Sequence, residues 1–394
     1  MISFIREIAN GIDELINAGV ISESKRIVIY GLDRYSFAIR TILSHRSLVT
    51  SAFISEDEAL VMRTRRQIQD FACRYFRYDR DAIDLLGMDK ASVMQDDTVI
   101  LLAEPYYEKK KELLDQHGFK EGVDYYEVYD FYDETIDSTI AGKQKLDLSD
   151  IQECGRGMLK LLDEFCCENG LRYWASGGTM LGAVRHNGFI PWDDDVDIHM
   201  PMKDYMRLLT EFPTGNRFSF KGFGPNGGGE FHDSFARLID GNTVLDHNMK
   251  IVRELSGIGV DIFPLIGVPD DPEERKMFFR GYQELEKSIL QEFYDTDGDL
   301  GVFKRRFPEQ EAFLRKIDFD DANYVGVIGT AYGENDFTHK EVYYETLRFK
   351  FDDLEVNVPK GYDEYLSSLY GSDWMELPPA SKRKSLHTIN AYRA

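Results

Sequence analysis

The chain has 394 residues, of which 43% are hydrophobic, 13% aromatic and 30% charged. This composition is typical of a folded globular protein, and the length allows two or three domains of roughly 100–200 residues each. The 70 acidic residues outnumber the 47 basic ones and give a net charge of −23. Nucleic acid is therefore not expected as a partner, because binding it requires a basic surface.

Cysteine usage and the N-terminal stretch indicate the compartment. The four cysteines include an adjacent pair, Cys166-Cys167, and form no CxxC or metal-binding spacing. This pattern predicts a reduced, cytoplasmic protein. Residues 1–21 combine helical apolar spacing with acidic residues, so we expect an amphipathic helix and neither a signal peptide nor a membrane span. Packing on its own domain is the favoured role for this helix, with at most peripheral membrane contact.

Strands and helices alternate over the first 140 residues. Apolar runs predict strands at 26–33, 48–57, 97–105 and 125–133, and helical patterns lie between them at 34–46, 58–72 and 106–118. This order predicts a mostly parallel sheet covered on both faces, a Rossmann-like three-layer domain spanning residues 1–140.

The first strand–helix turn of this domain reads Gly31-Leu32-Asp33 and lacks the further glycines of a dinucleotide site. Leu32 would crowd a pyrophosphate and Asp33 would repel it. We therefore expect no dinucleotide here, and a scaffold or homo-oligomer contact is the better interpretation.

A polar stretch at 133–150 is the expected boundary, and a helix is predicted at 151–170 with Gly170 as its C-cap. A strand at 171–176 then leads through Ser176-Gly177-Gly178 into a helix at 179–186, with Thr179 near its N-terminal cap. Such a turn presents backbone N–H groups to an anion. A simple tight turn is the alternative.

The run Asp193-Asp194-Asp195-Val196-Asp197 carries the strongest chemical signal. If residues 195–200 form a strand, Asp195 and Asp197 share one face and Asp194 lies on the other. Carboxylates that close repel unless a cation lies between them, and oxygen ligands suit Mg²⁺ or Mn²⁺. Asp193, ahead of the strand, is expected to be solvated or in a turn. A solvated acidic turn is the alternative for the whole run.

The segment 257–270 predicts a second apolar strand with a single acid, Asp261. That acid could join the pair on a neighbouring strand. Further along, we expect a flexible hairpin connection at 221–231 and a strand–turn–strand unit at 235–245. Helices are expected at 270–294, where the helix would cover one side of the site, and at 362–371.

From residue 148 onward the chain resembles the LicD family of phosphotransferases, with fukutin-type relatives. The motifs that carry the resemblance are GGTMLGAVRHNGFIPWDDDVDI, VDIFPL and the C-terminal FDDLEVNVPKGYDEYLSSLYGSDWMELPP. The resemblance implies that residues 148–394 form a nucleotidyltransferase-like mixed-sheet domain with helical insertions, so that the whole chain combines α/β and α+β parts. One departure is Phe351-Asp352-Asp353, where the family often has FEG.

The resemblance also assigns roles. Gly177-Gly178 becomes the phosphate turn, Asp195 and Asp197 the metal-binding pair, and Asp261 either a metal ligand or a catalytic base. Further residues are candidates for substrate contact: Ser176, Thr179, Arg185, His186, Trp192, Asp194, Lys384 and His387. Ordinary helix-terminal charges, packing of Trp192 and a solvated basic tail are the competing interpretations for several of them.

The implied reaction moves a phospho-alcohol, phosphocholine or a polyol phosphate, from a CDP-linked donor to a hydroxyl of a cell-surface glycan or lipid-linked glycan precursor, and releases CMP. The cofactor would be Mg²⁺ or Mn²⁺. Two alternatives remain open. One is a nucleotidyltransferase that uses an NTP and releases pyrophosphate, and the other is an inactive glycan-binding or scaffold protein of the same fold.

Overall fold

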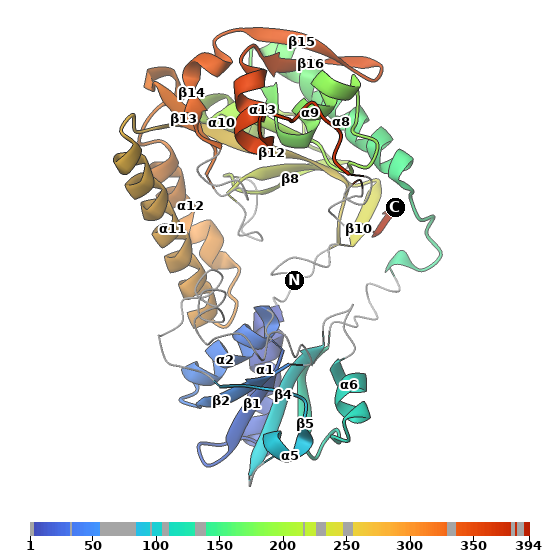
Figure 1. Cartoon of the computed structure of the whole chain (residues 1–394), viewed down its shortest axis with the longest axis vertical. Helices are drawn as coiled ribbons and strands as arrows, with labels where there is room; N and C mark the ends of the chain where they lie inside the picture. The colour runs from blue at the N-terminus through green and yellow to red at the C-terminus, as the bar shows by residue number, and fades with distance from the viewer. Residues whose placement is uncertain are drawn as a thin grey trace. The chain divides into compact units, whose positions relative to one another are not determined.

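The computed structural model describes residues 4–31, 34–55, 84–94, 97–104, 110–130, 139–215, 217–225, 234–246, 255–328, 336–379, 383 and 390–394. They divide into two compact units (Figure 1). Unit 1 contains the described residues of Met1–Thr139 together with Lys287–Leu300, and unit 2 contains the rest. The chain therefore returns to unit 1 after entering unit 2, which the sequence did not indicate.

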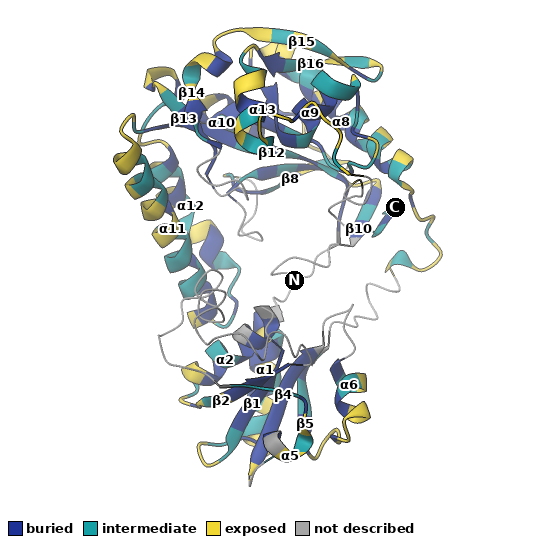
Figure 2. Ribbon diagram, viewed as in Figure 1, coloured by how far each residue is buried: buried dark blue, intermediate teal, exposed yellow. Residues whose placement is uncertain are grey.

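Unit 1 is built on a five-stranded parallel sheet in the order β3-β2-β1-β4-β5. Its strands are β1 (Arg26–Tyr30), β2 (Thr50–Ile54), β3 (Asp84–Leu86), β4 (Thr98–Glu104) and β5 (Tyr125–Asp130). β1 and β4 run through the middle and are buried, as Figure 2 shows. The predicted parallel α/β sheet is confirmed. The three-residue strand β3 was missed because it is too short to show a pattern.

Four described helices belong to this unit: α1 (Phe4–Asn17), α2 (Arg34–His45), α5 (Lys90–Val93) and α6 (Lys110–Gln116). α1 packs against β5 and α2, so the amphipathic N-terminal helix lies on its own unit. Gly11 permits this close approach, since a Cβ there would lie 2.3 Å from the carbonyl oxygen of Val128. The predicted helix at 58–72 lies outside the described residues. Leu32 and Asp33 do as well, so the absence of a dinucleotide stays a prediction.

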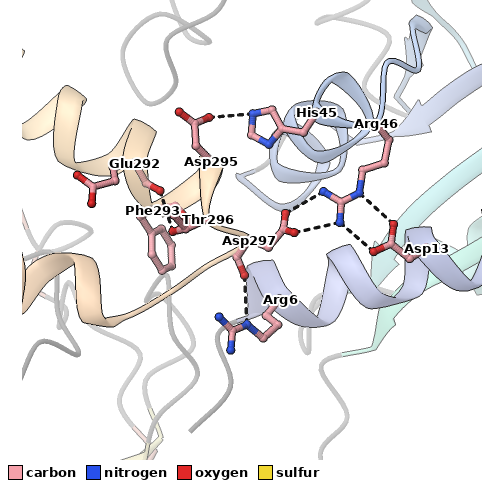
Figure 3. A network of polar contacts seen from close by, with 9 residues as sticks. All are labelled: Arg6, Asp13, His45, Arg46, Glu292, Phe293, Asp295, Thr296 and Asp297. Atoms are coloured by element: carbon pink, nitrogen blue, oxygen red, sulfur yellow. Dashed lines mark hydrogen bonds and ion pairs between the residues drawn. The ribbon is translucent and has the colours of Figure 1, made fainter.

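Unit 1 is completed by Lys287–Leu300, which comprises the last turns of helix α11 (Pro272–Asp295) and the residues that follow it. Figure 3 shows Arg46 between two carboxylates, with paired hydrogen bonds of 2.8–3.0 Å to Asp13 and to Asp297. His45 contacts Asp295 at 3.0 Å. These contacts fix the end of α11 and the turn after it against α1 and α2.

Unit 2 is organised around the ten-residue strand β12 (Gly259–Val268). Its first half pairs in parallel with β7 (Asp197–Pro201) on one side and antiparallel with β9 (Ala236–Asp240) on the other. Its second half pairs with β13 (Tyr324–Gly326). The sheet extends through β6 (Trp174–Ala175), β8 (Phe218–Gly222) and β14 (Thr338–His339). This is a mixed sheet, as predicted for the second domain.

Two smaller sheets belong to the same unit. One has the order β11-β10-β17, formed by Leu255–Ser256, Thr243–Asp246 and Asn390–Arg393. The other is the hairpin of β15 (Thr346–Phe351) and β16 (Leu354–Pro359). The predicted strand–turn–strand unit at 235–245 is corrected here. Both strands form, but β9 joins the main sheet while β10 pairs with β11 and β17.

The described helices of unit 2 include four that were predicted, at 151–170, 179–186, 270–294 and 362–371, and two that were not, at 202–211 and 301–314. They are α8 (Leu148–Asn169), α9 (Gly177–His186), α10 (Met202–Glu211), α11, α12 (Gly301–Leu314) and α13 (Tyr362–Tyr370), with short 3₁₀ turns at Phe319–Asp321 and Lys340–Tyr343. Asp147 and Asp150 form a capping box at the start of α8, and Gly170 ends it in the left-handed conformation. In the part of the chain that the structure describes, no helix is both long and apolar enough to cross a bilayer.

Candidate metal and phosphate site

Two acids lie in register at the centre of the main sheet of unit 2. Asp197 is the first residue of β7, and it pairs with Asp261 on the parallel neighbour β12. Directly paired residues of adjacent strands lie roughly 5 Å apart and point to the same face. The sequence prediction that Asp261 joins the acidic run from a neighbouring strand therefore agrees with the structure.

The carboxyl of Asp197 is strongly perturbed by its surroundings. Its pKa is raised well above the ordinary value, chiefly because burial removes the carboxylate from water. The negative charges that raise it further are, in decreasing order, those of Asp195, Asp261 and Asp193. The guanidinium of Arg237 lowers it. Three neighbouring acids thus oppose ionisation of Asp197 while the positive charge of Arg237 favours it, and a bound cation would suit this electrostatic setting.

The residues before β7 form a turn and not a strand. The strand begins at Asp197, so the alternation assumed for Asp195 does not apply. The backbone N–H of Asp193 donates to Ile190 at 2.9 Å, and the amide of Gln152 donates to the Asp193 carbonyl at 2.8 Å. Carboxylate oxygens of Asp193, Asp194 and Asp195 come within 4.8 Å of one another. Asp194 is buried and Asp193 only half-buried. In the described part of the chain, the acidic run is therefore not a fully solvated turn.

The glycine turn lies against these acids. A Cβ on Gly178 would lie 2.5 Å from Oδ2 of Asp193, and one on Gly177, where φ is 49°, would lie 3.2 Å from Oδ2 of Asp197. A side chain at 178 would therefore displace the Asp193 carboxylate, and the positive φ at 177 favours glycine there.

Hydrogen bonds fix helix α9 to strand β7 at the same place. Ser176 is the N-cap, and its N–H donates to the carbonyl of Asp197 at 3.0 Å. Thr179 does not cap the helix, which corrects the expected position of the cap. Its hydroxyl accepts the backbone N–H of Asp197 at 2.9 Å. The start of α9 and the start of β7 are thereby held together as one piece.

Arg185 and His186 lie at the other end of α9. Nη1 of Arg185 donates to the main-chain carbonyls of Trp374 at 2.6 Å and Glu376 at 3.1 Å. The pKa of each side chain is lowered, first by burial. Arg185 thus anchors the segment that follows α13, and a contact with a substrate phosphate remains a prediction.

Trp192 lies beside the acidic turn with two neighbours. The ring of His186 meets it edge-on with centroids 6.3 Å apart, and the guanidinium of Arg383 lies 5.9 Å from its ring. Nε of Arg383 also donates to the carbonyl of Pro378 at 2.8 Å. Lys384 and His387 lie outside the described residues, so their proposed contacts stay predictions.

The departure at Phe351-Asp352-Asp353 forms the turn of the β15–β16 hairpin, with Asp352 in the left-handed conformation at φ 57°. The N–H of Asp352 donates to the carbonyl of Asn187 at 2.7 Å. Arg156 forms ion pairs with Asp352 at 3.7 Å and with Asp353 at 3.0 Å. This loop therefore contacts the C-terminal end of α9.

Sequence reasoning missed one residue of the site, Arg237. It lies on β9, directly opposite Asp261, and its guanidinium makes a two-point ion pair with that carboxylate. The signal was present as a lone cation inside the apolar strand Ala236–Asp240. It could be interpreted only after β9 and β12 were known to be neighbours.

Comparison with known proteins identifies the region that carries this site. Residues 170–290 match the family model described as LicD/FKTN/FKRP, nucleotidyltransferase domain. The lipopolysaccharide cholinephosphotransferase LicD of Haemophilus influenzae is 26% identical over 260 residues, an alignment covering 59% of this chain and 94% of that protein.

Two further similarities are short. The ribitol 5-phosphate transferase FKRP of Homo sapiens is 54% identical over 35 residues, which cover 9% of this chain and 7% of that protein. The uncharacterized protein RP689 of Rickettsia prowazekii is 39% identical over 74 residues, 19% of this chain and 25% of that protein. Together with the family match, these similarities show that residues 170–290 of this chain are a LicD family nucleotidyltransferase domain.

Proposed function

We propose that this protein transfers a phospho-alcohol group from a CDP-linked donor to a hydroxyl of a glycan or lipid-linked glycan precursor. The observation that carries the proposal is that Asp193 and Asp197 lie against the glycine turn of α9, while Asp261 pairs with Asp197 from the neighbouring strand β12. The names of the two characterised relatives, a cholinephosphotransferase and a ribitol 5-phosphate transferase, support phospho-alcohol transfer as the reaction class.

The acids suit a hard divalent cation. Removal of the carboxyl from water and repulsion from Asp195, Asp261 and Asp193 raise the pKa of Asp197, so a bound cation would relieve an existing electrostatic cost. All the donors are carboxylate oxygens, which favours Mg²⁺ or Mn²⁺ over softer metals. Asp195, Asp197 and Asp261 are the ligands we propose. When bound, the metal would neutralise phosphate charge and stabilise the departing CMP.

The chain itself has two tasks in this reaction. The start of α9, held to β7 through Ser176 and Thr179, offers backbone N–H groups to a donor phosphate. The acceptor oxygen would bond to the phosphorus of the alcohol phosphate while the bond from that phosphorus to CMP breaks. The hydroxyl proton must leave as the new bond forms, and a nearby carboxylate or water would accept it.

Product analysis tests the reaction class. The protein would be incubated with Mn²⁺ and CDP-choline, or with Mn²⁺ and CTP, in the presence of a glycan acceptor extract. The proposal expects CMP from CDP-choline with wild type and loss of at least about 10³-fold in the Asp197→Asn variant. Asp353→Asn, at an exposed hairpin turn, is the matched control and should retain activity.

Other outcomes would favour the alternatives. Pyrophosphate released from CTP would indicate a nucleotidyltransferase. Absence of any Mn²⁺ binding by calorimetry would support an inactive scaffold. If Mn²⁺ binds but CDP-choline is not used, a panel of CDP-alcohols can be screened by thermal stabilisation, since a ligand at 100 times its Kd adds about 2.7 kcal/mol.

A further inference from the structure

A row of three charged residues crosses the main sheet of unit 2. Arg237 on β9 pairs with Asp261 on β12, and Asp261 pairs with Asp197 on β7. Directly opposite residues share a face, so the three side chains stand side by side above the same surface. Asp261 is the middle member, with Arg237 on one side and Asp197 on the other.

The contact between Arg237 and Asp261 is specific in geometry. Nε donates to Oδ1, and Nη2 donates to Oδ2 at 2.5 Å. Both side chains are only 16% exposed. A fork of two parallel hydrogen bonds fixes the plane of a carboxylate as well as its position, which a single contact does not do.

The side chain of Arg237 is itself held in place by its surroundings. Its stem crosses Gly259, where a Cβ would lie 2.5 Å from Cγ and 2.6 Å from Cδ of the arginine. Its guanidinium lies 5.7 Å from the centre of the Phe235 ring. Phe235 packs on Phe263 with ring centroids 4.5 Å apart. Asp261 is thus oriented by an arginine that the sheet has already immobilised.

We propose that Arg237 is a positioning residue that fixes Asp261 as a ligand of the metal centre. This rests on the proposed function, because it assigns Asp261 to metal binding and not to proton abstraction. A carboxylate has about four lone-pair positions, so one that accepts two hydrogen bonds from arginine still has lone pairs to offer a cation. Arg237 would hold those remaining lone pairs toward the Asp197 side of the row.

The direction in which Mn²⁺ affinity changes when Arg237 is removed distinguishes a positioning role from that of a nearby positive charge. If Arg237 acted only as a nearby positive charge, removing it would strengthen binding of Mn²⁺, because a repelling cation has gone. If it positions Asp261, removing it weakens binding, and losses of about 10–100-fold are typical when a group that orients a metal ligand is removed. A purely structural role would lower the melting temperature and leave Mn²⁺ affinity unchanged.

The test is Mn²⁺ titration by calorimetry on the full chain without any donor, so that it does not depend on transfer activity. Arg237→Met should weaken Mn²⁺ binding by about 10-fold or more. Arg237→Lys restores the charge but not the two parallel hydrogen bonds to Asp261, so it should recover only part of the lost Mn²⁺ affinity. Gly259→Ala leaves every charge in place but displaces the arginine stem, and it should also weaken binding.

The matched control is Arg217→Met. Arg217 makes the same kind of two-point pair, at 3.0 and 2.8 Å, with Asp240 at the far end of β9. Its loss should lower the melting temperature without changing the Kd for Mn²⁺. Thermal melts of each variant show which ones fold.

A double-mutant cycle completes the test. In an Asp261→Asn background, Arg237→Met should cause no further loss of Mn²⁺ affinity, because its partner is already gone. An equal further loss there, or unchanged or tighter binding in the single variant, would overturn the inference while leaving the metal centre intact. Absence of Mn²⁺ binding in wild type would instead overturn the proposed metal-dependent function.

Discussion

The four acids of the run Asp193-Asp194-Asp195-Val196-Asp197 differ in their surroundings although they lie within five residues of one another. Asp194 is buried in the turn before β7, whereas Asp193 and Asp195 in the same segment and Asp197 at the start of the strand are half-buried. The sequence located all four because like charges among apolar neighbours are rare. Asp193 was expected to be solvated or in a turn, and it lies half-buried in the turn before β7 with its carboxylate against Gly178. That contact depends on helix α9 packing back on the turn, and no local pattern encodes it.

The raised pKa of Asp197 gives the metal-free protein a specific pH dependence. In the unfolded chain this carboxyl titrates near pH 3.9, whereas in the folded protein it keeps its proton to a higher pH. Between these two values the folded state binds more protons than the unfolded state, so stability contributed by Asp197 is lost as pH rises. Asp197→Asn should remove this part of the slope.

Urea denaturation in EDTA at several pH values between 5 and 8 would measure the slope for wild type and variant. The difference between the two curves isolates Asp197 from other titrating groups. The expected result is that Asp197→Asn is equal to wild type at low pH and more stable at high pH. A variant that loses stability uniformly at all pH values would contradict the assignment.

Asp193→Asn should weaken Mn²⁺ binding less than Asp197→Asn does, and more than Asp353→Asn at the exposed hairpin turn does. Asp193 is close enough to raise the pKa of Asp197, but it is third among the charges that do so. Calorimetric titration of the three variants with Mn²⁺ gives the order. Binding as tight in Asp193→Asn as in Asp353→Asn would show that Asp193 does not contribute to the site.

At the scale of elements, strong periodicity made α8, α9, α13 and β12 predictable. Each carries its own signals, such as the capping residue Asp147 and the terminal glycines Gly170 and Gly371. Pairing between distant strands was not predictable. β9 and β10 look like one hairpin in sequence, yet their partners lie in different sheets, and one of these is the C-terminal strand β17. For the same reason Arg237 could not be assigned to the site from sequence.

The bond between α9 and β7 can be tested through Thr179. Thr179→Val keeps the shape of the side chain but removes the acceptor of the Asp197 N–H. An unsatisfied buried donor costs about 1–3 kcal/mol of unfolding free energy. Urea denaturation should show this loss for Thr179→Val and little change for Thr179→Ser, which keeps the hydroxyl. Equal stability of all three proteins would mean that the hydrogen bond does not hold the two elements together.

At the scale of the whole molecule, the chain forms two units, and unit 1 is made from two separate stretches of sequence. Composition and strand–helix alternation were sufficient to suggest an N-terminal α/β unit. They could not reveal that Lys287–Leu300 belongs to it, because that segment begins within the long helix α11, whose pattern continues without interruption. The link depends on ion pairs such as that between Arg46 and Asp297, which are invisible until the fold is known.

Arg46→Met should loosen this returning segment selectively. Without the guanidinium, Asp297 and Asp13 lose their shared partner. Hydrogen–deuterium exchange of residues 287–300 should accelerate, while exchange in β12 stays the same. Arg207→Met, which removes an exposed pair with Glu211 on α10, serves as the control and should change neither region. Unchanged protection of 287–300 in Arg46→Met would show that other contacts hold the segment.

The divided sequence of unit 1 also sets an order of events during synthesis. Asp297 is made 167 residues after Asp130, the last residue of β5. At roughly 5–20 residues per second this is a delay of about 8–33 s. Throughout that interval Arg46 can reach Asp13 but not Asp297. The first part of the chain to be translated is therefore among the last to be completed, and a nascent chain stalled before residue 297 would present α1 and α2 without the segment that covers their charged ends.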